Sequence, residues 1–144
     1  MILPDVNLLL HAYNSGSAVH SAAREWWEAL LEEDEPVRLA WVVILGFIRL
    51  STHRQIAAQP LPVSTACNFV ETWLARPQVS VIHPGARHGE ILFGLLRHAG
   101  AGGNLTTDSH LAALAIEHGA ELCSTDSDFA SFPGLRWRNP LAKS

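Results

Sequence analysis

Cysteine and lysine are scarce in this sequence, and both scarcities limit what the protein can be. Cys67 and Cys123 are the only two cysteines in 144 residues, and neither lies in a motif with the spacing of metal ligands. We therefore predict two reduced thiols, packed in the core of a cytoplasmic protein. Lys143 is the only lysine, so arginine supplies nearly all of the positive charge.

Long apolar runs are also missing. No stretch approaches the roughly 18 apolar residues that would cross a bilayer. The start Met1–Asp5 lacks the basic region of a secretory signal. We expect no membrane partner. Hydrophobic residues make up 48% of the chain and charged residues 17%, which indicates a globular fold in a single domain over residues 1–144.

An excess of positive charge is absent as well. The formal net charge is −4, so the composition gives no general attraction to nucleic acid. Arginine has a planar guanidinium that suits phosphate groups, so a local RNA-binding face remains open.

What the sequence does contain is a regular alternation of strand-like and helix-like segments. Alternation of this kind predicts an α/β fold with a mostly parallel sheet covered on both faces. The expected strands are 2–5, 37–40, 79–82, 121–124 and 135–138. The expected helices include residues 8–13 and span 19–31, 41–52, 63–75, 85–99 and 105–118.

Four aspartates stand where these strands end or helices begin: Asp5, Asp108, Asp126 and Asp128. Each has a structural explanation, since Asp5 and Asp108 suit helix N-caps and the other two suit turns. In a parallel sheet, however, the ends of the first and fourth predicted strands meet at one edge, together with the start of the helix that holds Asp108.

Carboxylates crowded at one edge call for a cation. Two like charges about 4 Å apart repel by roughly 4 kcal/mol at an effective dielectric of about 20. The pKa values of such groups rise unless a cation offsets the repulsion. Oxygen ligands favour Mg²⁺ or Mn²⁺, and neither a histidine nor a cysteine is placed to make a zinc site beside Asp5. The predicted chemistry is metal-dependent hydrolysis of a phosphodiester.

Other chemistries fit poorly. Ser124 has no histidine beside it to activate a nucleophile. The run 100–103 lacks the Lys-Ser/Thr that completes a phosphate-binding loop. Asn7 stands where a haloacid-dehalogenase-type phosphotransferase would need its second aspartate. A receiver-like signalling domain would need a lysine near a late strand, and Lys143 lies in the tail.

The same residues resemble a known family. The segments 4–7, 107–112 and 124–129, in this order and spacing, resemble a PIN domain, and within that family a VapC-type toxin of a bacterial toxin–antitoxin pair. The resemblance covers nearly the whole chain. It implies a PIN-like three-layer α/β/α sandwich, a Mg²⁺- or Mn²⁺-dependent endoribonuclease acting on RNA, a VapB-type antitoxin partner and a homodimer.

The resemblance also implies roles for individual residues. Asp5 and Asp108 would be the principal metal ligands and catalytic residues, and Asp126 would complete the site with Asp128 as a helper. Asn7 matches a polar residue that supports the first aspartate.

One position departs from the pattern. Gly46 stands about where most such toxins carry a glutamate, which leaves one fewer carboxylate for a second cation. An alternative is therefore a catalytically degraded module that binds RNA or an antitoxin without cleaving.

Several other residues have weaker claims on function. Arg49 lies one helical turn after Gly46, where it would either contact substrate phosphate, pair with a site aspartate, or extend to water as a helix-terminal cation. We expect His110 to pack rather than to catalyse. The five tryptophans are expected in the core or a dimer interface.

Overall fold

The computed structural model describes residues 1–142, so Lys143 lies outside the described residues. Its centre is a five-stranded sheet of order β3-β2-β1-β4-β5, and every neighbouring pair of strands is parallel. The strands are β1 (Ile2–Pro4), β2 (Val37–Ala40), β3 (Val79–Ile82), β4 (Glu121–Cys123) and β5 (Trp137–Arg138).

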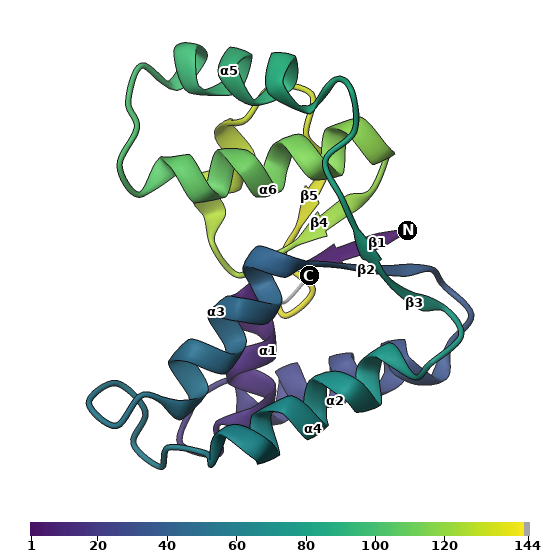
Figure 1. The fold of residues 1–144 in the computed structure, drawn as a ribbon, viewed down its shortest axis with the longest axis vertical. Helices are drawn as coiled ribbons and strands as arrows, with labels where there is room; N and C mark the ends of the chain where they lie inside the picture. Colours follow the sequence, from purple (N-terminus) through teal and green to yellow (C-terminus); the bar gives the residue numbers. More distant parts are fainter. Residues whose placement is uncertain (143–144) are drawn as a thin grey trace.

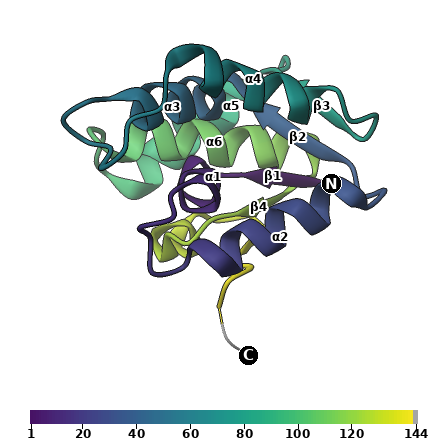
Figure 2. The ribbon, with the colours of Figure 1, turned by 90° about the horizontal axis from the view of Figure 1, so that it is seen from below.

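Helices cover both faces of this sheet, as Figure 1 shows: α1 to α4 lie on one side, and α5 and α6 lie on the other. Figure 2 gives a second view of the same layers. The predicted three-layer α/β/α sandwich is confirmed. The helices are α1 (Val6–Tyr13), α2 (His20–Glu32), α3 (Trp41–Thr52), α4 (Val63–Leu74), α5 (His88–Ala99) and α6 (Leu105–His118).

The strand order explains why helices lie on both faces. The chain steps from β1 outward to β2 and β3, then crosses back to β4 on the other side of β1. Right-handed crossovers in opposite directions place their helices on opposite faces. As a result the carboxyl ends of β1 and β4 are neighbours, with Pro4 paired to Cys123.

The core on the α1–α4 side is built around aromatic rings. Trp27 and Trp73 are almost completely buried, and the indole of Trp73 donates a hydrogen bond of 2.8 Å to the Tyr13 hydroxyl. The rings of Phe47 and Trp73 pack edge to face, with centroids 4.8 Å apart. Trp41 lies outside the core, with half of its surface exposed at the start of α3, so the dimer-interface alternative stays a prediction for this residue.

Most predicted elements occur within one or two residues, and the exceptions have physical reasons. Helix α5 begins at His88 rather than at Gly85. The Glu117 carboxylate accepts hydrogen bonds from the backbone N–H groups of Gly85 and Arg87, which fixes these residues as a loop. The last strand keeps only Trp137 and Arg138 of the predicted 135–138, because the segment before it turns at Gly134, whose φ is +80°.

Both cysteines are free, as predicted, although only one lies in the core. Cys123 is fully buried on β4, and burial raises the pKa of its thiol to about 12. Cys67 is only partly buried on α4. Across residues 1–142 no helix is both long enough and apolar enough to cross a membrane.

Candidate active site

Asp5 lies where β1 gives way to α1. Its backbone N–H donates to the carbonyl of Cys123 on β4, over 2.8 Å. Its carboxylate caps α1, because Oδ1 accepts a hydrogen bond of 2.7 Å from the Val6 N–H. The N-cap prediction for Asp5 is therefore confirmed. Capping uses one carboxylate oxygen and leaves Oδ2 for other partners.

Ser124 connects Asp5 to the end of β4. Its hydroxyl donates to Asp5 Oδ2 over 2.7 Å and accepts hydrogen bonds from Asn7 Nδ2 at 3.2 Å and from the Asp126 N–H at 3.0 Å. One donor and two acceptor sites are all that a hydroxyl has, so the hydrogen-bonding capacity of this buried side chain is used in full. The sequence pattern around Ser124 does not indicate this connecting role.

Asn7 fixes the same junction from the side of α1. Besides its bond to Ser124, its Oδ1 accepts from the Thr125 N–H at 3.4 Å. The segment after β4 is thus tied to the first turn of α1 through one amide side chain. This arrangement fits the supporting role expected of Asn7.

Asp126 and Asp128 begin a short 3₁₀ helix, Ser127–Ser131, which the sequence did not predict. Asp126 caps it, with Oδ1 accepting a hydrogen bond of 2.9 Å from the Asp128 N–H. Asp126 is partly buried, whereas Asp128 is exposed. The turn-forming reading of these residues is correct, and it leaves the second oxygen of Asp126 unused by the cap.

Asp108 lies in the first turn of α6, four residues after the N-cap residue Asn104, so the N-cap prediction for Asp108 is wrong. Its pKa is raised to about 6, first by burial and then by the negative charges of the other three aspartates. Burial also raises the pKa of Asp5, against the opposing hydrogen bonds from Ser124 and Val6. The charges of the other three aspartates therefore act on the carboxyl group of Asp108.

The fit of a divalent cation can be judged from these side chains. The donors are carboxylate oxygens and the local charge is negative, which is the chemistry that Mg²⁺ and Mn²⁺ prefer. In residues 1–142 no three His, Cys, Asp or Glu side chains are yet gathered closely enough to hold one ion. The type of donor therefore fits such an ion, whereas the described side chains do not form a three-ligand cluster.

His110 is directed to another partner. Its Nδ1 lies 2.9 Å from Nε2 of His88, a buried residue on α5, and burial together with the charge of His88 lowers the pKa of His110. The expectation that His110 packs agrees with this contact. No sequence pattern indicates that these two histidines pair.

Gly46 and Arg49 both lie on α3, and Gly46 has a close contact with the start of α1. A Cβ atom on Gly46 would lie 3.2 Å from Cγ2 of Val6, so the glycine allows α3 to approach the start of α1 closely. Arg49 is exposed, and among residues 1–142 it forms no ion pair with an aspartate. A contact of Arg49 with substrate phosphate stays a prediction.

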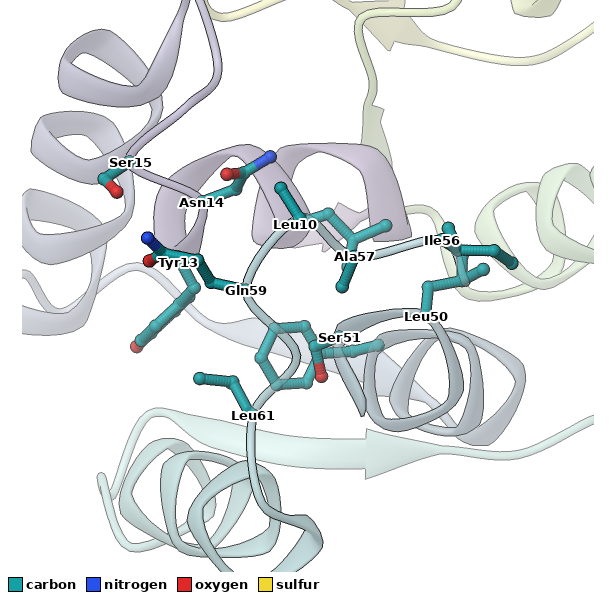
Figure 3. Close-up of a pocket in the computed structure, with 12 residues that line it drawn as sticks. Leu10, Tyr13, Asn14, Ser15, Leu50, Ser51, Ile56, Ala57, Gln59 and Leu61 are labelled. Carbon is teal, nitrogen blue, oxygen red and sulfur yellow. The ribbon is translucent and has the colours of Figure 1, made fainter. Parts of the chain in front are cut away.

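A pocket of about 320 Å³ lies apart from the four aspartates, between α1, α3 and the loop after α3. Figure 3 shows its mainly apolar wall, which includes Leu10, Leu50, Ile56 and Leu61. No carboxylate lines this pocket, so it is not a candidate for the phosphodiester chemistry.

Comparison with known proteins connects this geometry to a family. The sequence profile of the PIN domain matches residues 2–135. The chain belongs to the PIN domain family. Ribonuclease VapC33 of Mycobacterium tuberculosis is 41% identical over 141 residues, which are 98% of this chain and 99% of that protein. Ribonuclease VapC37 of the same organism is 42% identical over 142 residues, or 99% of each chain. The predicted resemblance to VapC-type PIN domains is confirmed.

Solved structures share the fold at lower sequence identity. VapBC-1 from nontypeable Haemophilus influenzae aligns with a TM-score of 0.68 at 15% identity, covering 99% of this PIN domain and all of that chain. VapC20 of M. tuberculosis, described as a sarcin-ricin loop cleaving toxin, aligns with a TM-score of 0.67 at 21% identity. The alignment covers 94% of this chain and 99% of VapC20. At these identities the likeness concerns the fold alone.

Proposed function

We propose that this VapC-type PIN domain is a Mg²⁺-dependent endoribonuclease that hydrolyses RNA phosphodiester bonds. The observation that carries the proposal is that the Ser124 hydroxyl bonds to the Asp5 carboxylate and to the Asp126 N–H at the paired carboxyl ends of β1 and β4. The raised pKa of Asp108, caused by burial and by the charges of Asp5, Asp126 and Asp128, supports it. Perturbed carboxyl groups at the carboxyl end of a parallel sheet are typical of functional sites. The curated relatives are named ribonucleases, which supports RNA as the substrate.

In this proposal Asp5, Asp108 and Asp126 hold the ion, and Asp128 lies beside them. When bound, Mg²⁺ or Mn²⁺ lowers the pKa of a water molecule and offsets negative charge on the phosphate. The chain's own part is to hold the carboxylates in place. Ser124 keeps Oδ2 of Asp5 oriented, and Asn7 fixes the loop that follows β4.

The experiment is cleavage of total RNA by the purified protein with Mg²⁺, with Mn²⁺ and after addition of EDTA. We expect cleavage that EDTA abolishes and that Asp5→Asn removes, while that variant keeps a cooperative unfolding transition. Asp34→Asn, in an exposed acidic loop, is the matched control and should cleave normally. Unimpaired cleavage by Asp5→Asn would refute the proposal.

A non-catalytic module that binds RNA is the alternative, and Gly46 at the usual glutamate position favours it. If RNA is retained in a filter-binding assay but is never cut under any metal condition, the alternative is correct. Such a result would leave the family assignment unchanged.

We also propose a VapB-type antitoxin partner and a homodimer. A solved toxin–antitoxin complex from Klebsiella pneumoniae shares the fold, which supports a partner of that kind. We expect a short reading frame for a DNA-binding protein beside this gene. Co-expression with its product should yield a complex that no longer cleaves RNA. Light scattering of the isolated protein should give twice its mass of 15.7 kDa.

A further inference from the structure

The pairing of β4 with β5 breaks off beside the candidate site. The Leu122 N–H donates to the Arg136 carbonyl at 2.9 Å, and the Ser124 N–H donates to the Arg138 carbonyl at 3.1 Å. In a parallel ladder of this register, the Ser124 carbonyl would accept its bond from the backbone nitrogen of residue 140. Residue 140 is proline, which has no N–H to donate.

A side chain takes the place of that missing donor. The indole Nε1–H of Trp137 donates a hydrogen bond of 3.1 Å to the Ser124 carbonyl. Trp137 is partly buried against the hydrophobic core, so its ring is held by packing as well. In residues 1–142 no backbone N–H donates to this carbonyl.

We propose that Trp137 is a positioning residue of the active site, and that its indole N–H supplies the ladder hydrogen bond that Pro140 lacks. The inference rests on the proposed function. Ser124 has no exposed surface, and a buried carbonyl without a partner is unfavourable. Because the Ser124 hydroxyl bonds to both Asp5 and Asp126, a shift of its backbone displaces two candidate ligands together.

The hydrogen bond from Trp137 to the Ser124 carbonyl matters because β5 ends here and forms no further backbone hydrogen bond to this carbonyl. The strand has only two residues, and the chain then turns away with the Leu141 N–H bonded to the Asn139 side chain. Trp137 thus supplies the last hydrogen bond between β5 and the segment that carries the site. The salt bridge of Arg138 with Glu121 lies further back along the strands and does not reach Ser124.

Trp137→Phe keeps an aromatic ring and removes the donor. We expect the Mg²⁺ concentration for half-maximal RNA cleavage to rise about fivefold, the effect of one lost hydrogen bond, with a smaller change in kcat at saturating metal. Trp26→Phe is the matched control, since Trp26 is also partly buried and donates no hydrogen bond among residues 1–142. If Trp137→Phe raises the Mg²⁺ concentration for half-maximal cleavage no more than Trp26→Phe does, the proposal is overturned.

Pro140→Ala provides the rescue, because it restores a backbone N–H at the ladder position. The double variant Trp137→Phe/Pro140→Ala should recover most of the metal response, and Pro140→Ala alone should behave like the wild type. Loss of function that Pro140→Ala does not restore would show that Trp137 acts by packing alone, and the hydrogen-bond role would be wrong.

A readout without catalysis separates this inference from the proposed function. In the wild-type protein, hydrogen exchange measured by NMR should be at least about tenfold slower for the Trp137 indole proton than for that of half-exposed Trp41. Equal exchange rates would overturn the role of Trp137 even in an active enzyme. A protected indole in a protein that cleaves no RNA would instead count against the proposed function alone.

Discussion

The Ser124 hydroxyl donates a hydrogen bond of 2.7 Å to Oδ2 of Asp5, across 119 positions of sequence. Both residues follow the last residue of a strand, and the strands β1 and β4 are paired in register. The bond favours the ionised form of Asp5 and lowers its pKa, against the larger effect of burial, which raises it. Ser124 therefore helps to keep the first candidate ligand charged.

Ser124→Ala should impair both stability and activity. The change leaves Asp5 Oδ2, Asn7 Nδ2 and the Asp126 N–H without their common partner, so we expect a loss of about 1–3 kcal/mol in the free energy of unfolding. Urea denaturation measures this loss, and RNA cleavage at limiting Mg²⁺ should fall about tenfold or more. Ser64→Ala, on the exposed side of α4, is the control. Similar losses in both variants would contradict the role of Ser124.

The fold could be predicted well because its signals are local. A left-handed glycine ends α6 at Gly119, and apolar periodicity marks each helix close to where it occurs. Element boundaries were predicted wrongly where they depend on contacts with residues far away in the sequence. The start of α5 depends on Glu117, which lies about thirty residues further along the chain, and no pattern around Gly85 indicates this contact.

The site shows the same division. The four aspartates were found because strand ends and helix starts can be read from short segments. Ser124 was missed as a positioning residue because its partners Asp5 and Asn7 come from the other end of the chain. The pair His88 and His110 was missed for the same reason, since it needs the packing of α5 against α6.

Removing the charge of Asp108 should stabilise the metal-free protein. The pKa of this carboxyl is about 6 in the folded chain, against about 3.9 when unfolded. The folded state holds the proton of Asp108 more tightly than the unfolded state does. The stabilisation that comes from protonating Asp108 is therefore complete below about pH 4 and is lost as the pH rises through about 6. With allowance for solvent screening, Asp108→Asn should raise the free energy of unfolding by about 1 kcal/mol at neutral pH.

Urea denaturation in EDTA between about pH 4 and pH 7.5 tests this expectation. The advantage of Asp108→Asn should vanish at the acidic end, where the wild-type carboxyl is protonated in both states. Asp34→Asn should show no such trend. An advantage that stays constant across the pH range would mean that charge repulsion is not its cause.

Without metal we expect Asp108→Asn to be more stable than the wild type, and a divalent metal ion should make the wild type the more stable of the two. An ion that binds only the folded state adds about 2.7 kcal/mol at a concentration of about 100 times its Kd. For a chain of this length that is a rise in Tm of roughly 5–10 °C, measured by calorimetry with Mg²⁺ or Mn²⁺. Asp108→Asn should lose most of the rise. An equal rise with NaCl at the same ionic strength would show screening instead of binding.

Gly46 and Val6 should be energetically coupled. An alanine at position 46 gains helix propensity of about 1 kcal/mol, but its Cβ would lie 3.2 Å from a methyl group of Val6, whose branched side chain turns with difficulty. We expect Gly46→Ala to be neutral or destabilising in the wild type, and stabilising by up to about 1 kcal/mol when Val6 is alanine. A double-mutant cycle measured by urea denaturation gives the coupling energy. Additive effects would mean that α3 moves away from α1 freely, and the close approach of the two helices would not explain the glycine at this position.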